Sequence, residues 1–305
     1  MRYLPRRPND SFLDIKCAIC ASSSYSILYP PNLGVLDEKT FSARRVSNGC
    51  HYRVVKCRKC GLVFSNPVLA FDEIKRLYAD SKFTYGSEVF DLKDTYTHYL
   101  ERYLSCAHKR ESFLEIGCGN GFFLEVALDL GFKNVYGVEA SREAVASAPS
   151  RVRGMIRNEM FDPSTFTSVR FDVICFFQTI DHVLDPNQFL SGCYSLLSNG
   201  GIVLCICHNI ESLLAKVLGE RCPMIDVEHI YLFSKSTLRR IFEKNGFDVI
   251  DVFDVYNRFS LEYWVRMCPF PTLLKRRVTN LLRTFGIEKW KLKLNAGNIG
   301  MVASK

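Results

Sequence analysis

The central part of the chain alternates short apolar runs with segments whose apolar residues recur every three or four positions. The apolar runs predict strands at 112–116, 135–139, 154–157, 171–177, 200–207 and 247–255. The segments between them predict helices. After the first strand, for example, Phe123, Val126 and Leu130 share one face, and Gly131 suits the end of the helix. This alternation over residues 111–255 is typical of an α/β fold with a doubly wound, Rossmann-like sheet.

The flanking regions follow other patterns. Residues 71–79 and 94–106 predict two helices, which would form a connector or lid over residues 71–110. A last strand is predicted at 298–303, after an amphipathic, basic insertion at 256–297. We therefore expect a small N-terminal module (1–70), the helical connector (71–110) and an α/β domain (111–305).

Composition narrows the class of protein. The 305 residues are 48% hydrophobic, which excludes a disordered or collagen-like chain. No apolar run approaches the roughly 18 residues of a membrane span, and residues 1–8 carry charge without the apolar core of a secretory signal. Several of the 13 cysteines stand singly inside apolar runs, as buried thiols do in a reducing compartment. We expect a cytoplasmic protein.

The net charge of +8 is unevenly distributed. Residues 1–62 hold 11 basic against 4 acidic residues, and residues 255–305 hold 10 against 2. Residues 63–254 hold 19 against 26, so a mildly acidic centre lies between two basic ends. Basic ends favour an anionic partner, such as a phosphate-bearing molecule, a nucleic acid or an anionic membrane surface; the alternative is ordinary solvated surface.

Two Cys-x-x-Cys pairs, Cys17/Cys20 and Cys57/Cys60, lie in the N-terminal module. Four thiolates from two tight turns match tetrahedral zinc, and such a closed site stabilises a fold without doing chemistry. The 36 residues between the pairs exceed the usual spacing of about 15–20, and a loop at Pro30–Gly34 accounts for the excess. Cys50–His51 is a spare pair of ligands that could replace one member. We predict a zinc-ribbon-like module holding structural Zn²⁺.

A glycine-rich loop follows the first strand of the α/β domain. Gly117, Gly119 and Gly121 precede a helix, and such a loop presents backbone N–H groups to an anionic group. Glu139 ends the second strand, where a carboxylate accepts hydrogen bonds from ribose hydroxyls. The glycine spacing departs from the dinucleotide pattern, and Glu115 would repel a pyrophosphate but suits an ammonium group. An NAD-dependent oxidoreductase is therefore the weaker interpretation.

The segment Glu115-Ile-Gly-Cys-Gly-Asn-Gly121, with Glu139, resembles the cofactor motif of class I S-adenosylmethionine-dependent methyltransferases. The resemblance covers residues 111–255 and the final strand, and it implies a seven-stranded sheet whose last strand is antiparallel. It also implies that S-adenosyl-L-methionine binds here, with Glu115 reaching its ammonium group and Glu139 its ribose. The full set of cofactor contacts that it implies is Glu115, Gly117, Cys118, Gly119, Gly121, Phe122, Glu139, Ala140, Ser141, Asn158 and Gln178.

Methyl transfer requires alignment of donor and acceptor, and a base only if the acceptor must lose a proton. His182 follows the fourth strand, at the edge where open α/β sheets bind ligands. Glu228–His229 resembles part of the Tyr-x-Glu-His pattern of sugar C-methyltransferases with an N-terminal zinc module, although Asp226 stands at the tyrosine position. His229 is our first candidate for the base, with Glu228 orienting it and His182 as the alternative; His229 could also simply line the pocket.

The acceptor is the least determined part of the prediction. We expect a small molecule, carbohydrate or phosphate-bearing, most plausibly a nucleotide-linked or lipid-linked sugar. The basic insertion could cover the sheet as a lid, bind a phosphate or contact an anionic membrane. RNA methylation ranks behind these, because the Asn/Asp-Pro-Pro-aromatic tetrad of base-nitrogen methyltransferases is absent after the fourth strand. A catalytically inactive cofactor-binding scaffold is the remaining alternative.

Overall fold

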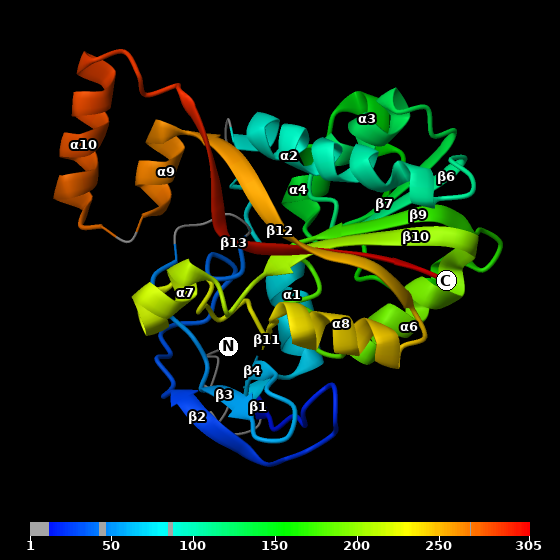
Figure 1. Cartoon of the computed structure of the whole chain (residues 1–305), viewed down its shortest axis with the longest axis horizontal. Helices are drawn as coiled ribbons and strands as arrows, with labels where there is room; N and C mark the ends of the chain where they lie inside the picture. Colours follow the sequence, from blue (N-terminus) through cyan, green and yellow to red (C-terminus); the bar gives the residue numbers. More distant parts are fainter. Residues whose placement is uncertain (1–11, 43–46, 85–87, 269) are drawn as a thin grey trace, which may run out of the picture.

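The computed structural model describes residues 12–42, 47–84, 88–268 and 270–305, so the predicted absence of a signal at the N-terminus lies outside the described residues. Its main sheet has seven strands in the order β12-β13-β10-β9-β6-β7-β8 (Figure 1). Their bounds are β6 Ser112–Ile116, β7 Asn134–Val138, β8 Ile156–Arg157, β9 Phe171–Phe177, β10 Leu197–His208, β12 Asp248–Ser260 and β13 Lys291–Ser304. Only β13 runs antiparallel to its neighbours β10 and β12. The predicted α/β fold with an antiparallel last strand is confirmed.

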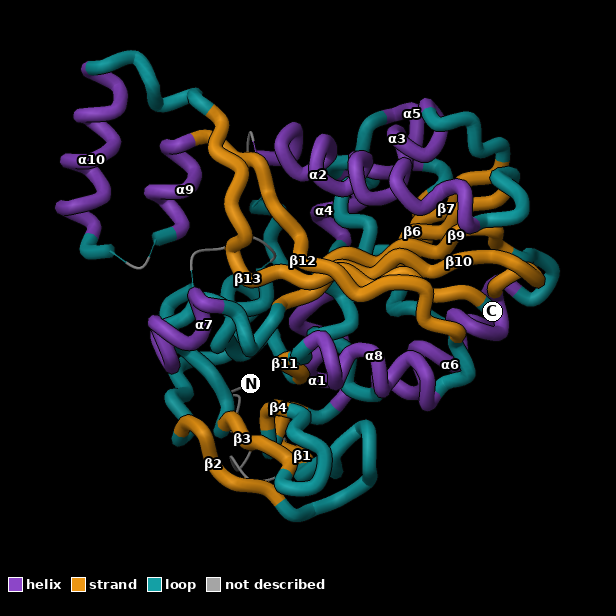
Figure 2. The backbone as a smooth tube through the Cα atoms, in the orientation of Figure 1, coloured by secondary structure: helices purple, strands orange, loops and turns teal. Residues whose placement is uncertain are grey.

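Helices cover both faces of the sheet (Figure 2). One face packs against α2 Glu88–Tyr103, α3 Phe122–Asp129, α4 Arg142–Ala146 and α5 Ser150–Arg153, and the short 3₁₀ turn Leu104–Cys106 follows α2. The other face packs against α1 Phe71–Ala79, α6 Pro186–Leu196 and α8 Lys235–Lys244. Further 3₁₀ turns lie at Pro163–Phe166 and Gly219–Arg221. The central strands β6 and β9 are buried on both sides, as their continuous apolar runs predict.

The N-terminal residues form two small sheets against the α/β domain. β1 Phe12–Leu13 pairs with β5 Val68–Leu69, and a four-stranded sheet has the order β11-β4-β3-β2. The second sheet comprises β2 Tyr25–Tyr29, β3 Val54–Cys57, β4 Val63–Ser65 and β11 Tyr231–Leu232. β11 comes from the α/β part of the chain and pairs with β4 of the N-terminal part, with Tyr231 opposite Phe64. The two parts therefore share one sheet.

Beyond the edge of the main sheet, β12 and β13 continue as a two-stranded ribbon (Figure 1). The ribbon carries α9 Leu261–Met267 and α10 Thr272–Thr284, and α7 Leu213–Leu218 lies closer to the domain. Residues 256–260 and 291–297 are therefore strand, whereas the sequence predicts that one strand ends at 255 and the last begins at 298. The alternation that extends β12 is visible in its side chains: Asn257 and Phe259 are buried, and Tyr256 and Arg258 are exposed. Within the described residues, no helix combines the length and apolarity that crossing a membrane requires.

Candidate functional site

The glycine loop turns sharply from β6 into α3. Gly117, Gly119 and Gly121 all have positive φ, at 75°, 57° and 75°, a conformation that side chains rarely adopt. A Cβ at Gly117 would also lie 2.6 Å from the Thr179 hydroxyl oxygen. The loop is fixed to the second strand because the N–H groups of Gly117 and Cys118 both donate to the Val138 carbonyl, at 2.8 and 3.1 Å. The glycines thus let a backbone surface, free of side chains, face the adjoining space.

Glu139 lies directly beside this loop. One carboxylate oxygen accepts a hydrogen bond from Gly119 N at 2.8 Å, and the other accepts one from Ser141 N at 2.7 Å. Burial raises the pKa of this carboxyl group, and the backbone hydrogen bonds from Ser141 and Gly119 oppose the rise. The Asn158 amide donates to the carbonyls of Glu139 and Ala140, which attaches the end of β8 to the same turn.

A single cavity of about 1360 Å³ begins at this loop. Of the predicted cofactor contacts, its wall contains Gly117, Gly119, Glu139, Ala140, Ser141, Asn158 and Gln178. A cavity of this size exceeds the range of about 300–1,000 Å³ that accommodates one small ligand. It therefore has room for two molecules.

The other predicted cofactor contacts lie behind the cavity wall. Cys118 and Phe122 are buried in the core, where Phe122 stacks on Tyr96, and Gly121 caps α3. The Glu115 side chain is buried, and its Oε2 has no hydrogen-bond partner among the described residues. Burial, and then the nearby Glu139 carboxylate, raise the pKa of Glu115 well above its usual range. The role of these four residues in cofactor binding remains a prediction.

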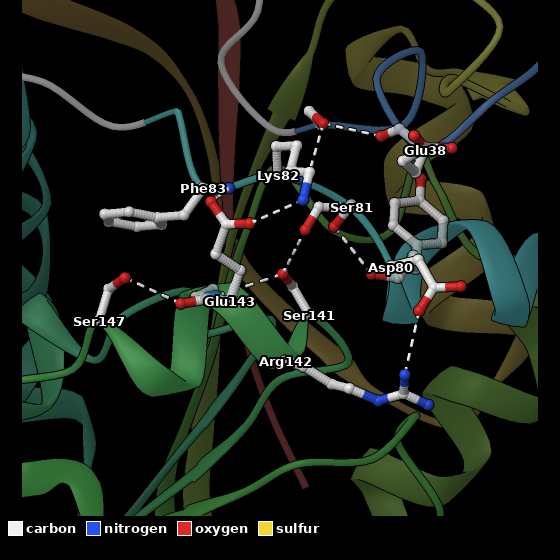
Figure 3. A network of polar contacts seen from close by, with 12 residues as sticks. Glu38, Asp80, Ser81, Lys82, Phe83, Ser141, Arg142, Glu143 and Ser147 are labelled. Carbon is white, nitrogen blue, oxygen red and sulfur yellow. Dashed lines mark hydrogen bonds and ion pairs between the residues drawn. The ribbon is translucent and has the colours of Figure 1, made fainter.

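The segment after α1 closes the cavity near Ser141. Figure 3 shows how residues 80–83 are attached to the start of α4. The Ser141 hydroxyl donates to the Ser81 carbonyl at 3.1 Å, and the Glu143 carboxylate accepts from Phe83 N at 3.1 Å. Ion pairs join Lys82 to Glu143 at 3.3 Å and Asp80 to Arg142 at 3.0 Å. The predicted connector thus forms part of the cavity wall.

Three histidines gather in the wall of the same cavity. His182 follows β9, His208 ends β10 and His229 precedes β11, and all three line the cavity. The His229 ring centroid lies 4.8 Å from that of His182 and 4.5 Å from that of His208. We call these three residues the histidine cluster.

Asp181 holds the histidine cluster in place. Its carboxylate is fully buried, with one oxygen 2.7 Å from His208 Nδ1 and the other 3.8 Å from His182 Nε2. Burial opposes ionisation, but the neighbouring His182 and His208 outweigh it and hold the pKa of Asp181 well below its usual range. Asp181 is therefore an ionised counter-charge beneath the cluster.

His229 has the geometry of a neutral base. Its Nδ1 lies 2.9 Å from the Met224 carbonyl oxygen. Because a carbonyl can only accept, Nδ1 carries the hydrogen, and Nε2 has the lone pair. Burial lowers the pKa of His229 well below 6.5, with further lowering by His208 and His182. The imidazole is therefore unprotonated at neutral pH.

Sequence analysis missed two members of this site. His208 stands at the carboxyl end of a buried strand, the same signal that singled out His182. Tyr78 reaches the cluster from α1, where its hydroxyl lies 2.8 Å from His182 Nδ1. Asp226, at the expected tyrosine position, accepts from the Ser47 hydroxyl at 2.7 Å and from Glu228 N at 3.2 Å. The tyrosine hydroxyl near the cluster thus comes from a different element, and nothing in the sequence of α1 marks Tyr78 as a site residue.

The four predicted cysteine ligands converge at the tips of the N-terminal turns. The Sγ atoms of Cys17 and Cys60 lie 3.2 Å apart, those of Cys20 and Cys57 lie 3.5 Å apart, and all four lie within 4.8 Å of one another. The spare ligand His51 lies elsewhere: its ring contacts the Tyr52 carbonyl and the Glu220 carboxylate, and Cys50 Sγ accepts from Gly34 N. The arrangement of the four thiols matches a closed tetrahedral metal site.

Comparison with known proteins gives matches over the α/β domain. Residues 88–252, more than half of the chain, match a family model described as a methyltransferase domain. A Mycolicibacterium smegmatis protein named as a probable S-adenosylmethionine-dependent methyltransferase is 28% identical over 149 residues, which are 48% of this chain and 56% of that protein. A ubiquinone biosynthesis O-methyltransferase of Cereibacter sphaeroides is 30% identical over 117 residues, 36% of this chain and 47% of that protein.

The chain thus spans about half the length of the curated relatives it matches. Among solved structures, an S-adenosylmethionine-dependent methyltransferase from Archaeoglobus fulgidus is similar, with a TM-score of 0.46 and 20% identity. That match covers 70% of this chain and 94% of the other.

Proposed function

The chain belongs to the methyltransferase domain family, and from this premise we propose that it transfers a methyl group from S-adenosylmethionine to a small-molecule acceptor. One observation carries the proposal. The glycine loop and Glu139, the first end of the site in this proposal, line the same cavity as the histidine cluster, its second end. A donor at the first end and an acceptor at the second would meet inside one enclosure, where alignment and exclusion of water promote displacement.

The residues at the first end fit the donor. The open backbone of the glycine loop accommodates a closely packed ligand, and the Glu139 carboxylate retains lone pairs beyond the two backbone hydrogen bonds it accepts. In this proposal Glu139 holds the ribose, and Ala140, Ser141 and Asn158 surround the adenosine. When bound, the cofactor supplies a methyl group on a positively charged sulfur, which is already activated for displacement.

The residues at the second end would handle the acceptor. His229, neutral and with its Nε2 lone pair available, would remove a proton from an acceptor hydroxyl or from a carbon beside a keto group. Glu228 and His182 would position His229 and the acceptor, since both lie in the same cavity wall. The ionised Asp181 would stabilise the imidazolium that forms.

A hydroxyl-rich acceptor suits this end of the cavity. Its wall adds the amide side chains Asn257, Asn298 and Gln178 to the histidines, and Gln178 Oε1 has no hydrogen-bond partner among the described residues. We propose a nucleotide-linked or lipid-linked sugar, methylated on oxygen or carbon. The similarity to an O-methyltransferase of ubiquinone biosynthesis favours oxygen as the methylated atom.

We further propose that the four cysteines bind one structural Zn²⁺. The two turns that carry them are each closed by a backbone hydrogen bond, Ala21 N to Cys17 O at 2.8 Å and Gly61 N to Cys57 O at 3.0 Å. Four thiolates fill a tetrahedral shell and leave no position for a reacting water, so the role would be stability alone.

Calorimetric titration tests the proposal. The purified chain should bind S-adenosylmethionine and its demethylated product, but not NAD; binding of NAD alone would refute it. A panel of nucleotide-linked and lipid-linked sugars then tests turnover by release of the demethylated product. The variant His229→Asn separates an enzyme from a scaffold, because it should retain cofactor binding while losing turnover. A wild-type chain that binds cofactor but methylates nothing in the panel would leave the scaffold as the better description.

A further inference from the structure

The ribbon and helices at residues 256–297, which we call the arm, project from the edge of the main sheet (Figures 1 and 2). In these views α10 lies farthest from the sheet. It contributes no buried residue to the protein. The expectation that the insertion covers the sheet as a lid therefore does not hold for α10.

One exposed flank of α10, away from its contacts with α9, is apolar. Contacts to α9 come from Lys275, whose Nζ donates to the Arg266 carbonyl, and from Arg283, which pairs with Glu262 at 2.6 Å. At 100° per residue, Leu274, Leu281 and Phe285 fall together on another side of the helix. The exposed fractions of Leu281 and Phe285 are 57% and 68%, and nearby Leu273 and Trp290 are 72% and 67% exposed.

Positive charge surrounds this apolar side. The arm holds nine basic residues against two acidic ones, Glu262 and Glu288. Arg276 and Arg277 are exposed, and Arg277 projects between Leu273 and Leu281 on the helical wheel. Long basic side chains at the margin of an apolar stripe are the arrangement of helices that lie in a lipid–water interface.

We propose that the arm docks the protein on an anionic membrane surface, with α10 lying in the interface. Charge complementarity selects this occupant over a second copy of the chain, since two arms would bring like charges together. The exposed leucines Leu273, Leu274 and Leu281 select it over RNA, whose backbone gains nothing from aliphatic contacts.

Docking in this way would bring the cavity to the membrane. Helix α9 is the part of the arm that reaches the cavity, because Tyr263, Trp264 and Met267 line the cavity wall. An acceptor carried on a lipid could then enter from the surface. This consequence, unlike the docking itself, rests on the proposed function.

Vesicle flotation tests the docking. The wild-type chain should float with phosphatidylcholine vesicles containing about one third phosphatidylglycerol, and not with phosphatidylcholine alone. Raising the salt from about 0.05 to 0.5 M should weaken binding. Arg276→Gln/Arg277→Gln should weaken it about thirty-fold, at roughly five-fold per charge. The matched pair Lys109→Gln/Arg110→Gln, exposed and outside the arm, should leave it unchanged.

The apolar contribution has its own pair of variants. Leu281→Ser/Phe285→Ser should weaken vesicle binding at least tenfold, whereas Ile27→Ser/Val35→Ser, at similarly exposed positions of the N-terminal module, should not. Failure of the wild type to float, or equal flotation with neutral vesicles, overturns the proposal. Two other results overturn the proposal: a wild-type chain that sediments as a dimer while the Leu281→Ser/Phe285→Ser variant does not, or RNA binding that is the same in the wild type and in this variant. Glu139→Ala separates the two proposals, since it should weaken cofactor binding but still float.

Discussion

Replacement of Glu139 is the sharpest test of the cofactor site. A carboxylate offers about four lone-pair positions, and two of those on Glu139 accept the N–H groups of Gly119 and Ser141 at 2.8 and 2.7 Å. Two positions remain for the two ribose hydroxyls. Since the backbone bonds exist with or without ligand, only the ribose bonds enter the difference in binding.

The magnitude follows from those two bonds. A hydrogen bond to a charged group contributes about 1.5–3 kcal/mol, partly offset because both partners are hydrated before they meet. We expect Glu139→Ala to weaken binding by about 1–3 kcal/mol, or about 5- to 150-fold in Kd. Glu139→Gln should bind the cofactor no more tightly than Glu139→Ala. The amide NH₂ group of Gln would have to face the N–H of Gly119 or of Ser141, and two donors cannot form a hydrogen bond. Glu111→Ala, which removes an exposed carboxylate that pairs with Lys133, is the matched control.

Calorimetric titration of the four proteins with S-adenosylmethionine gives the result directly. Because burial raises the pKa of Glu139, wild-type affinity should also fall as the pH is lowered through that raised pKa, above the usual 4.5, and the alanine variant should lack this dependence. A folded Glu139→Ala protein with a Kd within about twofold of wild type would refute the placement of the ribose.

Three further outcomes can be measured, each with one variant protein. The wild type should contain about one zinc per chain by plasma emission spectroscopy, and Cys57→Ser/Cys60→Ser should contain none and unfold at lower temperature; a folded, zinc-free wild type contradicts this. Glu115→Gln should raise Tm at pH 7. Burial raises the pKa of Glu115 in the folded protein, so above about pH 4.5 the carboxyl ionises more readily in the unfolded chain, and this costs the wild type stability. The gain in Tm should vanish below that pH. An unchanged or lower Tm at pH 7 would show that interactions in the folded protein already offset the cost of burying the Glu115 carboxyl. His229→Asn should lower kcat about 10²- to 10⁴-fold at unchanged cofactor affinity. Wild-type kcat/KM should stay level as the pH falls through 6.5 and drop only in more acid solution, since the base must be unprotonated and its pKa is lowered; a drop centred at 6.5 or above excludes His229.

Local patterns carried most of the fold prediction. The strand, glycine loop, helix and acid of residues 112–139 are encoded within 28 successive residues, so their geometry follows from turn chemistry and periodicity. The clustering of Cys17 and Cys20 with Cys57 and Cys60 could likewise be predicted from the sequence, because each turn brings two cysteines together on its own.

Features that depend on distant contacts were harder to predict. Tyr78 joins His182 across more than a hundred residues only because α1 packs beneath the sheet, and nothing in its own helix distinguishes it from a core residue. β11 is two residues long and exists because β4 offers a free edge. Residues 291–294 alternate lysine and leucine, a strand pattern that their charge concealed within a basic segment.

The sheet shared by the two parts of the chain couples the cysteine cluster to the histidine cluster of the cavity. The Ser65 hydroxyl donates to the His229 carbonyl at 3.1 Å, and Ser65 N donates to the Ile230 carbonyl at 2.7 Å. The proposed base is thus held by a strand that begins three residues after Cys60. A chain shortened to residues 71–305 would leave the backbone groups of Tyr231 and Leu232 without their partners and the His229 backbone without its anchor. The N-terminal residues therefore support one wall of the cavity, which Phe41 and Ser47 also line, and removing them would open it.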